Sequence, residues 1–417
     1  MDGTLAIIFE RPCHYVAGEA MQIGIVGKPN VGKSTFFSAA TLAPAEIADY
    51  PFTTIKPNKG VAYLRTRCPH LDLGEPCHPK NSACDNGLRL VPVELLDVAG
   101  LVPDAWQGKG LGNQFLDDLR QADALIHVVD ASGSTNSEGV GVPPHSHDPM
   151  IDVRFLESEI DHWIKGILEK GWEKSARQAH IEDIKIESVI YEKLTGLGVS
   201  INSIHAALRE AALPDSAINW KDAEMLRLAS SIRKISKPMM LALNKADVAE
   251  DQTLKHMSKV DHYFSVPTCA QSELALRKAA KVNLVEYQMG GSEFKVKEPA
   301  KLSPAQTKAL EYINSHVMSR FKGTGIQLCL ENTAFNLLDL IPVYPVEDET
   351  KWTDKAGNVL PDTHLVKKGA TARELAYKIH TDLGDNFIRA LNCRTHRIVG
   401  HDYVLQASDV ITIISKK

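Results

Sequence analysis

The sequence lacks any apolar run of the roughly 18 residues that a membrane-spanning helix needs. We do not expect residues 1–20 to be a signal peptide, because their short apolar stretch is interrupted by Glu10 and Arg11. The net charge is only −5, which argues against a chain held on nucleic acid by bulk charge. No internal repeat and no CxxC pair are present. These absences predict a globular protein that does not enter a membrane.

What the chain does contain is ordinary globular composition, with 44% apolar and 24% charged residues over 417 residues. That length predicts two or three domains. Seven cysteines, an odd number, together with the missing export signal, predict a reducing, cytoplasmic location. The first convincing strand starts at Met21, so we expect residues 1–20 to be an extension with little part in the fold.

Apolar strands alternate with helical segments through most of the chain, which predicts an α/β fold with a mostly parallel, doubly wound sheet. The segment from 150 to 236 instead repeats apolar residues at helical spacing, so we expect an inserted helical, coiled-coil-like domain built as a long antiparallel pair. A β-rich pattern from 340 onward predicts a separate small module. The expected parts are an extension at 1–20, a nucleotide-binding domain at 21–149 and 236–334, a helical insert at 150–235 and a C-terminal domain at 335–417.

A glycine-rich loop after the first strand has the pattern GxxxxGK[ST] and opens a helix. Its glycines let successive backbone N–H groups point at phosphate oxygens, and the helix adds its positive N-terminal end. Lys33 supplies charge to the β- and γ-phosphates, and the Ser34 hydroxyl is a ligand for Mg²⁺. The expected phosphate-binding residues are Gly27, Lys28, Pro29, Asn30, Val31, Gly32, Lys33, Ser34 and Thr35.

Two further elements are expected to complete the phosphate and metal site. In Asp97-Val98-Ala99-Gly100, the strand-terminal Asp97 can hold Mg²⁺ through water, and the Gly100 N–H can meet the γ-phosphate and sense its loss. Pro51-Phe52-Thr53-Thr54 follows the first helix, and a threonine there can close over Mg²⁺; of the two we choose Thr54. Lys33, Thr54 and Gly100 form the expected catalytic set, and Ser34, Thr54 and Asp97 the expected Mg²⁺ ligands.

A base-recognition motif, Asn244-Lys245-Ala246-Asp247, stands at the end of a buried strand, where open α/β sheets bind ligands. The Asp247 carboxylate can accept two hydrogen bonds from guanine, at N1–H and the exocyclic amine. Asn244 can brace the loop and reach N7 of the base. Thr268, Cys269 and Ala270 follow the next strand and offer a backbone N–H to the base oxygen.

Together these motifs resemble the Obg superfamily of GTPases, specifically its YchF-like group. The resemblance rests on GKPNVGKST, DYPFTTIKPNKG, DVAGLV with GKGLGNQFLDDLRQADALIHVVD, and NKAD. The C-terminal segments IPVYPVED, GNVLP, VKKGATARELAYKIHTDLG and VLQASDVITII look like a TGS domain, a small β-grasp module. The resemblance covers nearly all of residues 21–417. It implies a three-part protein, slow intrinsic hydrolysis and association with ribosomes or translation factors.

The sequence leaves two questions open. One is whether GTP or ATP is preferred, and the other is which group orients the attacking water and supplies the positive charge that an arginine finger would provide. Typical YchF proteins lack a proper NKxD motif and prefer ATP, whereas this chain keeps the motif intact, as the archaeal-type branch does. Leu101 stands where many GTPases place a glutamine that orients water. Asn30 could coordinate K⁺ against the phosphates and supply the charge of an arginine finger. His127 is the nearest imidazole, although a histidine in a buried strand is more often structural.

Two other groups of residues have alternative interpretations. Cys68, His70, Cys77, His78 and Cys84 crowd an insertion between two strands, either as zinc ligands or as free side chains of a flexible loop. The C-terminal module contains basic residues that form either a solvated face or an RNA- or ribosome-facing surface. These are Lys367, Lys368, Arg373, Lys378, Arg389, Arg394 and Arg397.

We therefore expect a monomeric, Mg²⁺-dependent protein that hydrolyses GTP to GDP and phosphate and acts as a switch on the ribosome, with K⁺ as a second candidate ion. One alternative is an ATPase of the YchF type. The other is an RNA- or ribosome-binding adaptor with negligible turnover, in which the nucleotide only orders the domains.

Overall fold

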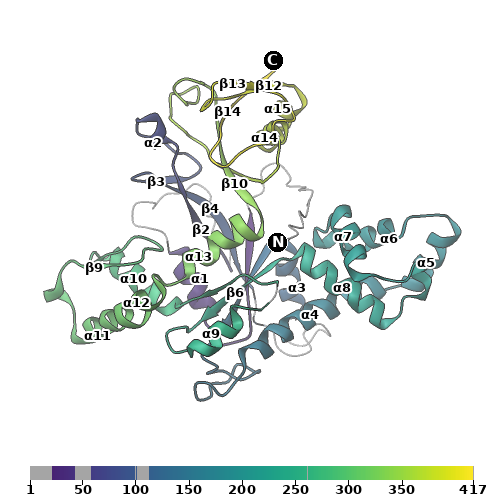
Figure 1. Ribbon diagram of the computed structural model, residues 1–417, viewed down its shortest axis with the longest axis horizontal. Coiled ribbons are helices and arrows are strands. Elements are labelled where there is room, and N and C mark those ends of the chain that lie inside the picture. Colours follow the sequence, from purple (N-terminus) through teal and green to yellow (C-terminus); the bar gives the residue numbers. More distant parts are fainter. Residues whose placement is uncertain (1–20, 43–57, 99, 101–111, 261, 417) are drawn as a thin grey trace, which may run out of the picture. The chain divides into compact units, whose positions relative to one another are not determined.

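The computed structural model describes residues 21–42, 58–98, 100, 112–260 and 262–416 (Figure 1). They form two compact units, of which one is the helical segment Glu157–Pro238 and the other contains the remaining described residues. The domain boundaries expected from the sequence stay predictions. Within the described residues, no helix combines the length and the apolar character that crossing a bilayer requires.

The larger unit is built on a seven-stranded sheet with the order β2-β4-β1-β5-β6-β7, in which β3 pairs with β4. β1 is parallel to β4 and β5, and β5, β6 and β7 continue the parallel arrangement, while β2 and β3 run antiparallel to β4. The mostly parallel sheet is therefore confirmed. Its strands are β1 Gln22–Val26, β2 Lys59–Arg67, β3 Ala83–Asp85, β4 Leu88–Asp97, β5 Ala124–Asp130, β6 Met239–Asn244 and β7 Ser265–Pro267.

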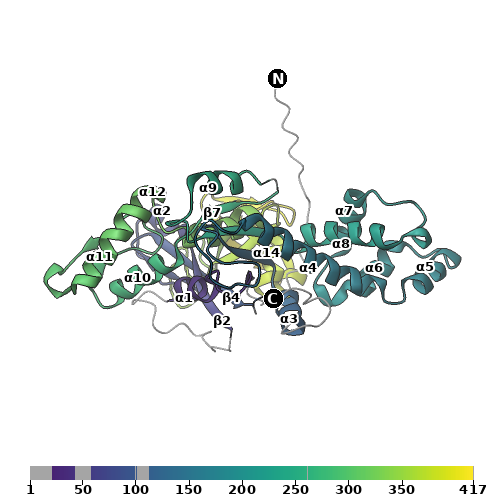
Figure 2. The ribbon, with the colours of Figure 1, turned by 90° about the horizontal axis from the view of Figure 1, so that it is seen from below.

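The centre of this sheet is covered on both faces. β5 and β6 are buried at every residue, which explains why their sequences are continuous apolar runs rather than alternating ones. α10, α11 and α12 gather in one group in both views of the ribbon (Figures 1 and 2). The α-helices of this unit are α1 Lys33–Thr41, α2 His70–Leu73, α3 Gly112–Gln121, α9 Asp251–Met257, α10 Ala270–Lys281, α11 Pro304–Tyr312, α12 Ser319–Phe321 and α13 Ile326–Glu331, while α4 Pro149–Glu169 begins in it and continues into the helical segment.

Shorter elements connect these helices. Two π-helical segments, η5 and η6, follow α11 and α13 directly, so that 304–321 is one continuous helical stretch. The remaining elements are η4 Pro299–Lys301, η5 Ile313–Met318, η6 Asn332–Leu337 and the paired strands β8 Val285–Glu286 and β9 Lys295–Val296.

The helical insert is confirmed, but it contains several helices rather than one long antiparallel pair. Gly171 and Gly198 both have φ of 66°, a left-handed conformation that interrupts helices at little cost only for glycine. Trp172 and Trp220 stack with ring centroids 5.4 Å apart. After α4 the elements are α5 Trp172–Ile181, α6 Ile186–Leu194, η2 Thr195–Leu197, α7 Ile201–Ala211, η3 Ala217–Asn219 and α8 Asp222–Ser236.

The C-terminal module has its own five-stranded sheet with the order β11-β10-β14-β12-β13. β10 is parallel to β14, and the other pairs are antiparallel, as expected for a β-grasp. The capping box at Thr371 starts the helix that packs on this sheet. The elements are β10 Leu340–Val346, β11 His364–Lys367, α14 Ala372–Ile379, α15 Thr381–Asp385, β12 Phe387–Asn392, β13 Arg397–Val399 and β14 Val410–Ser415.

Candidate functional site

The predicted motifs meet at the carboxyl ends of the parallel strands. β1 lies between β4 and β5, so the strand order reverses at β1, and such a switch point is where open α/β sheets bind ligands. The loop from Gly27 to Gly32 follows β1, Asp97 ends β4, and Asn244 ends β6. The fold therefore brings together residues that are more than 200 positions apart.

The glycines of the phosphate-binding loop hold conformations that other residues rarely adopt. Gly27 has φ of 145°, and a Cβ there would lie 2.5 Å from the Val128 carbonyl oxygen. Gly32 has φ of 101°, and a Cβ there would collide with the side-chain amide of Asn244. The loop therefore packs tightly against β5 and the base-recognition motif. Thr35 follows in the first turn of α1 and is half-buried.

Lys33, Ser34, Asp97 and Gly100 lie next to one another. The Lys33 ammonium donates to the carbonyl oxygen of Lys28 at 2.8 Å, and burial lowers the pKa of Lys33 despite the nearby Asp97 carboxylate. Burial raises the pKa of Asp97, and Lys33 and a hydrogen bond with Ser34 oppose that rise. A Cβ on Gly100 would lie 3.1 Å from the Lys33 nitrogen. The arrangement gathers the phosphate lysine, two oxygen ligands suited to Mg²⁺ and the glycine expected to sense the γ-phosphate.

Lys28 contributes only its backbone to this loop. Its ammonium donates to the carbonyl oxygen of Thr135 at 2.8 Å and forms an ion pair of 2.7 Å with Asp152 at the start of α4. Both charged side chains are at most 3% exposed. His147 approaches the other carboxylate oxygen of Asp152 at 2.8 Å. The Lys28 side chain therefore points away from the phosphate position, and only its N–H can serve a nucleotide.

Asn30 and Pro29 contact the loop that follows β5. The side-chain amide nitrogen of Asn30 donates to the carbonyl oxygen of Gly139 at 2.9 Å, and a Cβ on Gly139 would lie 2.6 Å from the Pro29 carbonyl oxygen. With its nitrogen engaged in this way, the Asn30 atom that can coordinate a cation is its amide oxygen.

Asn244 links the phosphate loop to the base-recognition loops. It is 4% exposed, its nitrogen donates to the Val31 carbonyl oxygen at 2.8 Å, and its oxygen accepts from the Ala270 N–H at 3.1 Å. The side chain therefore braces the loop. Any contact with N7 of a base would be shared with these hydrogen bonds.

Asp130, at the end of β5, is a site residue that the sequence reasoning missed. It is fully buried and accepts hydrogen bonds from the hydroxyls of Ser132, Ser134 and Thr135. The Lys245 ammonium lies 2.8 Å from it. Burial alone would raise the pKa of Asp130, but Lys245 and the hydroxyls hold it below the ordinary value. The sequence offered one clue to this role, because Asp130 is the last residue of the apolar run that forms β5. In the sheet it pairs with Asn244, which ends the neighbouring β6.

Asp247 is half-buried and already has partners in this structure. The Tyr312 hydroxyl donates to one of its carboxylate oxygens at 3.1 Å. Arg320 donates to the carbonyl oxygen of Ala246 at 3.1 Å and to the Asp251 carboxylate at 2.5 Å, which fixes the backbone around the motif. Burial and the Asp247 carboxylate raise the pKa of Tyr312 to about 12, so its hydroxyl stays a donor at neutral pH.

The backbone N–H groups of residues 268–270 are engaged within the protein. Thr268 donates to the Leu243 carbonyl oxygen at 2.8 Å, and Cys269 to the Thr324 carbonyl oxygen at 2.9 Å. Ala270 donates to Asn244, as described above. A base oxygen would therefore have to share or replace one of these acceptors.

His127 sits on β5 beside the phosphate-binding loop and is 1% exposed. Burial, with the positive charges of Lys33 and Lys28, lowers its pKa to about 3. The imidazole is therefore neutral at physiological pH, which fits a structural role. Thr53, Thr54 and Leu101 lie outside the described residues.

The strand order, the phosphate-binding loop at the switch point and the motifs at the strand ends define a P-loop nucleotide-binding protein of the GTPase fold. Three family models match the chain. They are a 50S ribosome-binding GTPase model over residues 22–155, an Obg-like GTPase YGR210-like G4 motif-containing domain over 242–348 and a TGS domain over 355–415.

Relatives match along nearly the whole chain. GTP-binding protein MJ1332 of Methanocaldococcus jannaschii is 49% identical and aligns over 94% of this chain and 98% of its own length. The crystal structure of a GTP-binding protein from Pyrococcus horikoshii OT3 is 45% identical, with a TM-score of 0.77 over 95% of this chain and 100% of the other. The ribosome-binding ATPase YchF of Bacillus subtilis is 27% identical over 94% of this chain and 98% of its own. The chain belongs to the Obg-like GTPase family, in its YchF/YGR210-like group, and ends in a TGS domain, which confirms the resemblance.

Proposed function

We propose that this protein is a Mg²⁺-dependent GTPase whose nucleotide state controls its attachment to the ribosome. The observation that supports GTP most directly is the braced base-recognition motif, in which Asn244 and Lys245 are held by buried partners and Asp247 presents a carboxylate. A role at the ribosome would place the protein in the cytoplasm, as the sequence predicts.

The described residues fit a triphosphate and its metal. Ser34 and Asp97 offer the oxygen ligands that Mg²⁺ prefers, and bound Mg²⁺ would neutralise part of the phosphate charge. Lys33 is partly desolvated and donates to a backbone carbonyl, so an anionic phosphate would give its ammonium a stronger acceptor. The amides of residues 27–32 and the N-terminus of α1 would surround the phosphates.

The preference for GTP over ATP follows from Asp247, because a carboxylate can only accept hydrogen bonds. Guanine offers it two donors, whereas adenine places an unprotonated N1 at the same position. Hydrogen bonds to a charged group contribute about 1.5–3 kcal/mol each. At about 1.4 kcal/mol per tenfold, discrimination of about a hundredfold or more is expected.

Isothermal titration with GTP and ATP tests this preference, and an Asp247→Asn variant sharpens the test. An amide can donate to the C2 oxygen of xanthine, so the variant should lose GTP affinity and gain affinity for xanthosine triphosphate. Equal or tighter binding of ATP by the unaltered protein would contradict the preference for GTP. It would favour the ATPase alternative, which the name of the YchF relatives suggests.

Multiple turnover of GTP distinguishes an enzyme from the alternative, an adaptor in which the bound nucleotide only orders the domains. The neutral, buried His127 offers no charge to the transition state. We therefore propose that the amide oxygen of Asn30 holds K⁺ there, with Lys33 and Gly100 completing the γ-phosphate site. Multiple-turnover phosphate release, measured with and without ribosomes in K⁺ and in Na⁺, is the test. No release above background in any of these conditions would favour the adaptor.

The ribosome-facing surface is assigned to the edge of the C-terminal sheet. Arg389 on β12 and Arg397 on β13 are exposed, and so are Ile388 and Ile398, at 55% and 64%. Arg394, by contrast, forms an ion pair with Asp72 at 2.5 Å. Arg389 shares a face of the sheet with Ile398, and Arg397 lies on the other face at the β13 edge, so basic and apolar side chains are exposed together along this edge, as suits a ribonucleoprotein partner.

Cosedimentation with ribosomes tests this surface. A variant with Arg389→Glu and Arg397→Glu should pellet less with ribosomes in the presence of a non-hydrolysable GTP analogue. Lys355→Glu is the matched control, because Lys355 is 88% exposed in the same module but lies outside β12 and β13. If both proteins cosediment as the unaltered chain does, this edge does not bind the ribosome.

A further inference from the structure

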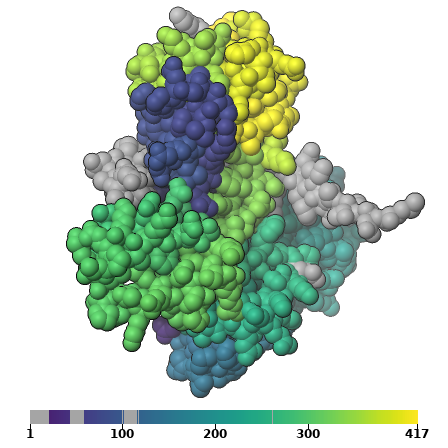
Figure 3. All heavy atoms as spheres, turned by 60° about the vertical axis from the view of Figure 1, so that its left-hand side comes forward, coloured from purple at the N-terminus to yellow at the C-terminus, as the bar shows by residue number. Residues whose placement is uncertain are grey.

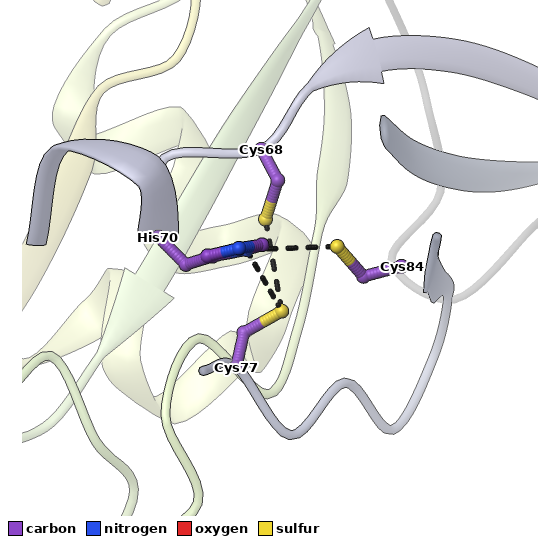
Figure 4. Close-up of side chains that lie close together, drawn as sticks. All are labelled: Cys68, His70, Cys77 and Cys84. Atoms are coloured by element: carbon purple, nitrogen blue, oxygen red, sulfur yellow. Dashed lines mark hydrogen bonds between the residues drawn. The ribbon is translucent and has the colours of Figure 1, made fainter. Parts of the chain in front are cut away.

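Four side chains that the nucleotide site does not use converge in the segment between β2 and β4. Cys68 directly follows β2, His70 begins α2, Cys77 lies in the next loop and Cys84 is on β3. Their sulfur and imidazole nitrogen atoms all lie within 4.8 Å of one another. Figure 4 shows the three sulfurs pointing toward the ring of His70 from three sides.

Three of the six distances among these atoms are close to those of a metal tetrahedron. Zinc binds sulfur at about 2.3 Å and imidazole nitrogen at about 2.0–2.1 Å, so tetrahedral geometry separates two sulfurs by about 3.8 Å and a sulfur from a nitrogen by about 3.6 Å. The Cys68 and Cys77 sulfurs are 3.8 Å apart. His70 Nδ1 lies 3.2 Å from the Cys77 sulfur and 3.5 Å from the Cys84 sulfur.

We propose that Cys68, His70, Cys77 and Cys84 bind one Zn²⁺ ion. Four protein ligands of the Cys₃His type leave no open position, which is the pattern of a structural site and not of a catalytic one. His78, the other histidine of this insertion, is not a ligand, because its Nδ1 accepts from the Val359 N–H at 3.4 Å. The absence of a CxxC pair does not argue against zinc binding, because the fold brings the four ligand atoms close together.

A buried arginine provides the charge that such a site needs. Zn²⁺ with three thiolates and a neutral imidazole carries a net charge of −1. Arg89 is fully buried, directs one guanidinium nitrogen at the Cys77 sulfur from 3.9 Å, and has no ion pair with a carboxylate among the described residues. Its Nε donates to the Thr363 hydroxyl at 2.9 Å. The zinc–thiolate centre would be the counter-charge of this cation, and Arg89 would act as an outer-shell partner of the metal.

The zinc site would fasten the insertion to the C-terminal module, which lies against it in Figure 3. Arg89 also donates to the Leu360 carbonyl oxygen, and Cys68 shares a hydrophobic cluster with Tyr344 and Trp352. His78 and Lys80 donate from their backbones to the carbonyl oxygens of Val359 and Pro361. The insertion has little regular structure of its own, so a metal would hold these contacts in place.

The experiment measures metal in the full-length chain purified after growth with added zinc. We expect about one zinc per chain, with Cys77→Ser and Cys84→Ser each losing it. His78→Asn is the matched control, because asparagine keeps an acceptor for the Val359 N–H, and this variant should keep its zinc. His70→Cys should also keep zinc, through four thiolates. Cys84→Ser should still bind GTP, so failure of the zinc site is distinguishable from failure of the proposed GTPase function.

Three results would overturn the proposal. They are purified chain without zinc or with iron in its place, full zinc content in Cys84→Ser, and a mass lower by two hydrogens that maps a disulfide to these cysteines. If the serine variants do not fold, Co²⁺ exchanged into the unaltered protein decides, because Cys₃His coordination gives a tetrahedral thiolate spectrum. A spectrum of octahedral Co²⁺ would reject the site.

Discussion

The two lysines of the phosphate-binding loop are expected to respond in opposite ways to the same substitution. Lys28 neutralises the buried Asp152, whereas Lys33 faces the phosphate position. Lys28→Ala should therefore lower the stability of the nucleotide-free protein and change nucleotide affinity only a few-fold. Lys33→Ala should leave that stability unchanged and weaken triphosphate binding.

The magnitudes follow from burial. Removing one partner of a buried ion pair costs about 3–5 kcal/mol, because the other charge stays behind without compensation. His147 hydrogen-bonds the Asp152 carboxylate at 2.8 Å and remains as its partner in the variant, so the low end of that range is expected for Lys28→Ala. Each charged hydrogen bond that Lys33→Ala removes is worth about 1.5–3 kcal/mol, which is a loss of about ten- to hundredfold in affinity per bond.

Urea denaturation without nucleotide, and titration of each variant with GTP, measure the two effects. The midpoint for Lys28→Ala should fall clearly below that of the unaltered protein, and the midpoint for Lys33→Ala should not. If Lys28→Ala unfolds at the original midpoint but binds GTP as weakly as Lys33→Ala, then Lys28 contacts phosphate and the reasoning from its ion pair is wrong.

Three further results are expected. Tyr312→Phe should tighten GTP binding by about tenfold, because it removes a competing donor from the Asp247 carboxylate, and at the exposed Tyr312 a hydrogen bond to a charged group contributes the low end of about 1.5–3 kcal/mol; calorimetry showing weaker binding would contradict this. The folded pKa of His127, about 3, lies below its unfolded value near 6.5. Protonation therefore favours unfolding, and stability should fall by up to about 1.4 kcal/mol per pH unit below 6.5. In His127→Leu, the part of the fall in unfolding free energy between pH 6.5 and 5 that protonation of His127 causes should be absent. Asn30→Ala should abolish any K⁺ stimulation of phosphate release while GTP affinity stays nearly unchanged, and equal rates in K⁺ and Na⁺ for the unaltered protein would already disprove the ion site.

Local patterns in the sequence predicted the sheet, the helical insert and the C-terminal module. The apolar runs of β5 and β6 are unambiguous because both faces of these strands are buried. The number of helices in the insert was not predictable in the same way. Apolar spacing identifies helices but does not show which of them pack together, and glycine at 171 and 198 divides the stretch.

The candidate site, too, was predictable from the sequence only in part. Motifs identified the loops that bear Lys33, Asp97 and Asp247, because each needs particular residue types at a fixed spacing. They did not show that Lys28 turns toward Asp152, or that Tyr312 reaches Asp247. Such contacts join residues that are far apart in the chain, and only the packing of loops and helices around the sheet determines them.

The bridging position of Asn244 has a consequence for how the two ends of a nucleotide are bound. A single amide restrains both the Val31 carbonyl of the phosphate loop and the Ala270 N–H of the base pocket. Fixing either loop therefore reduces the conformational entropy that the other still has to lose. Inorganic triphosphate should accordingly raise the affinity for guanosine, and guanosine should raise the affinity for triphosphate by the same factor.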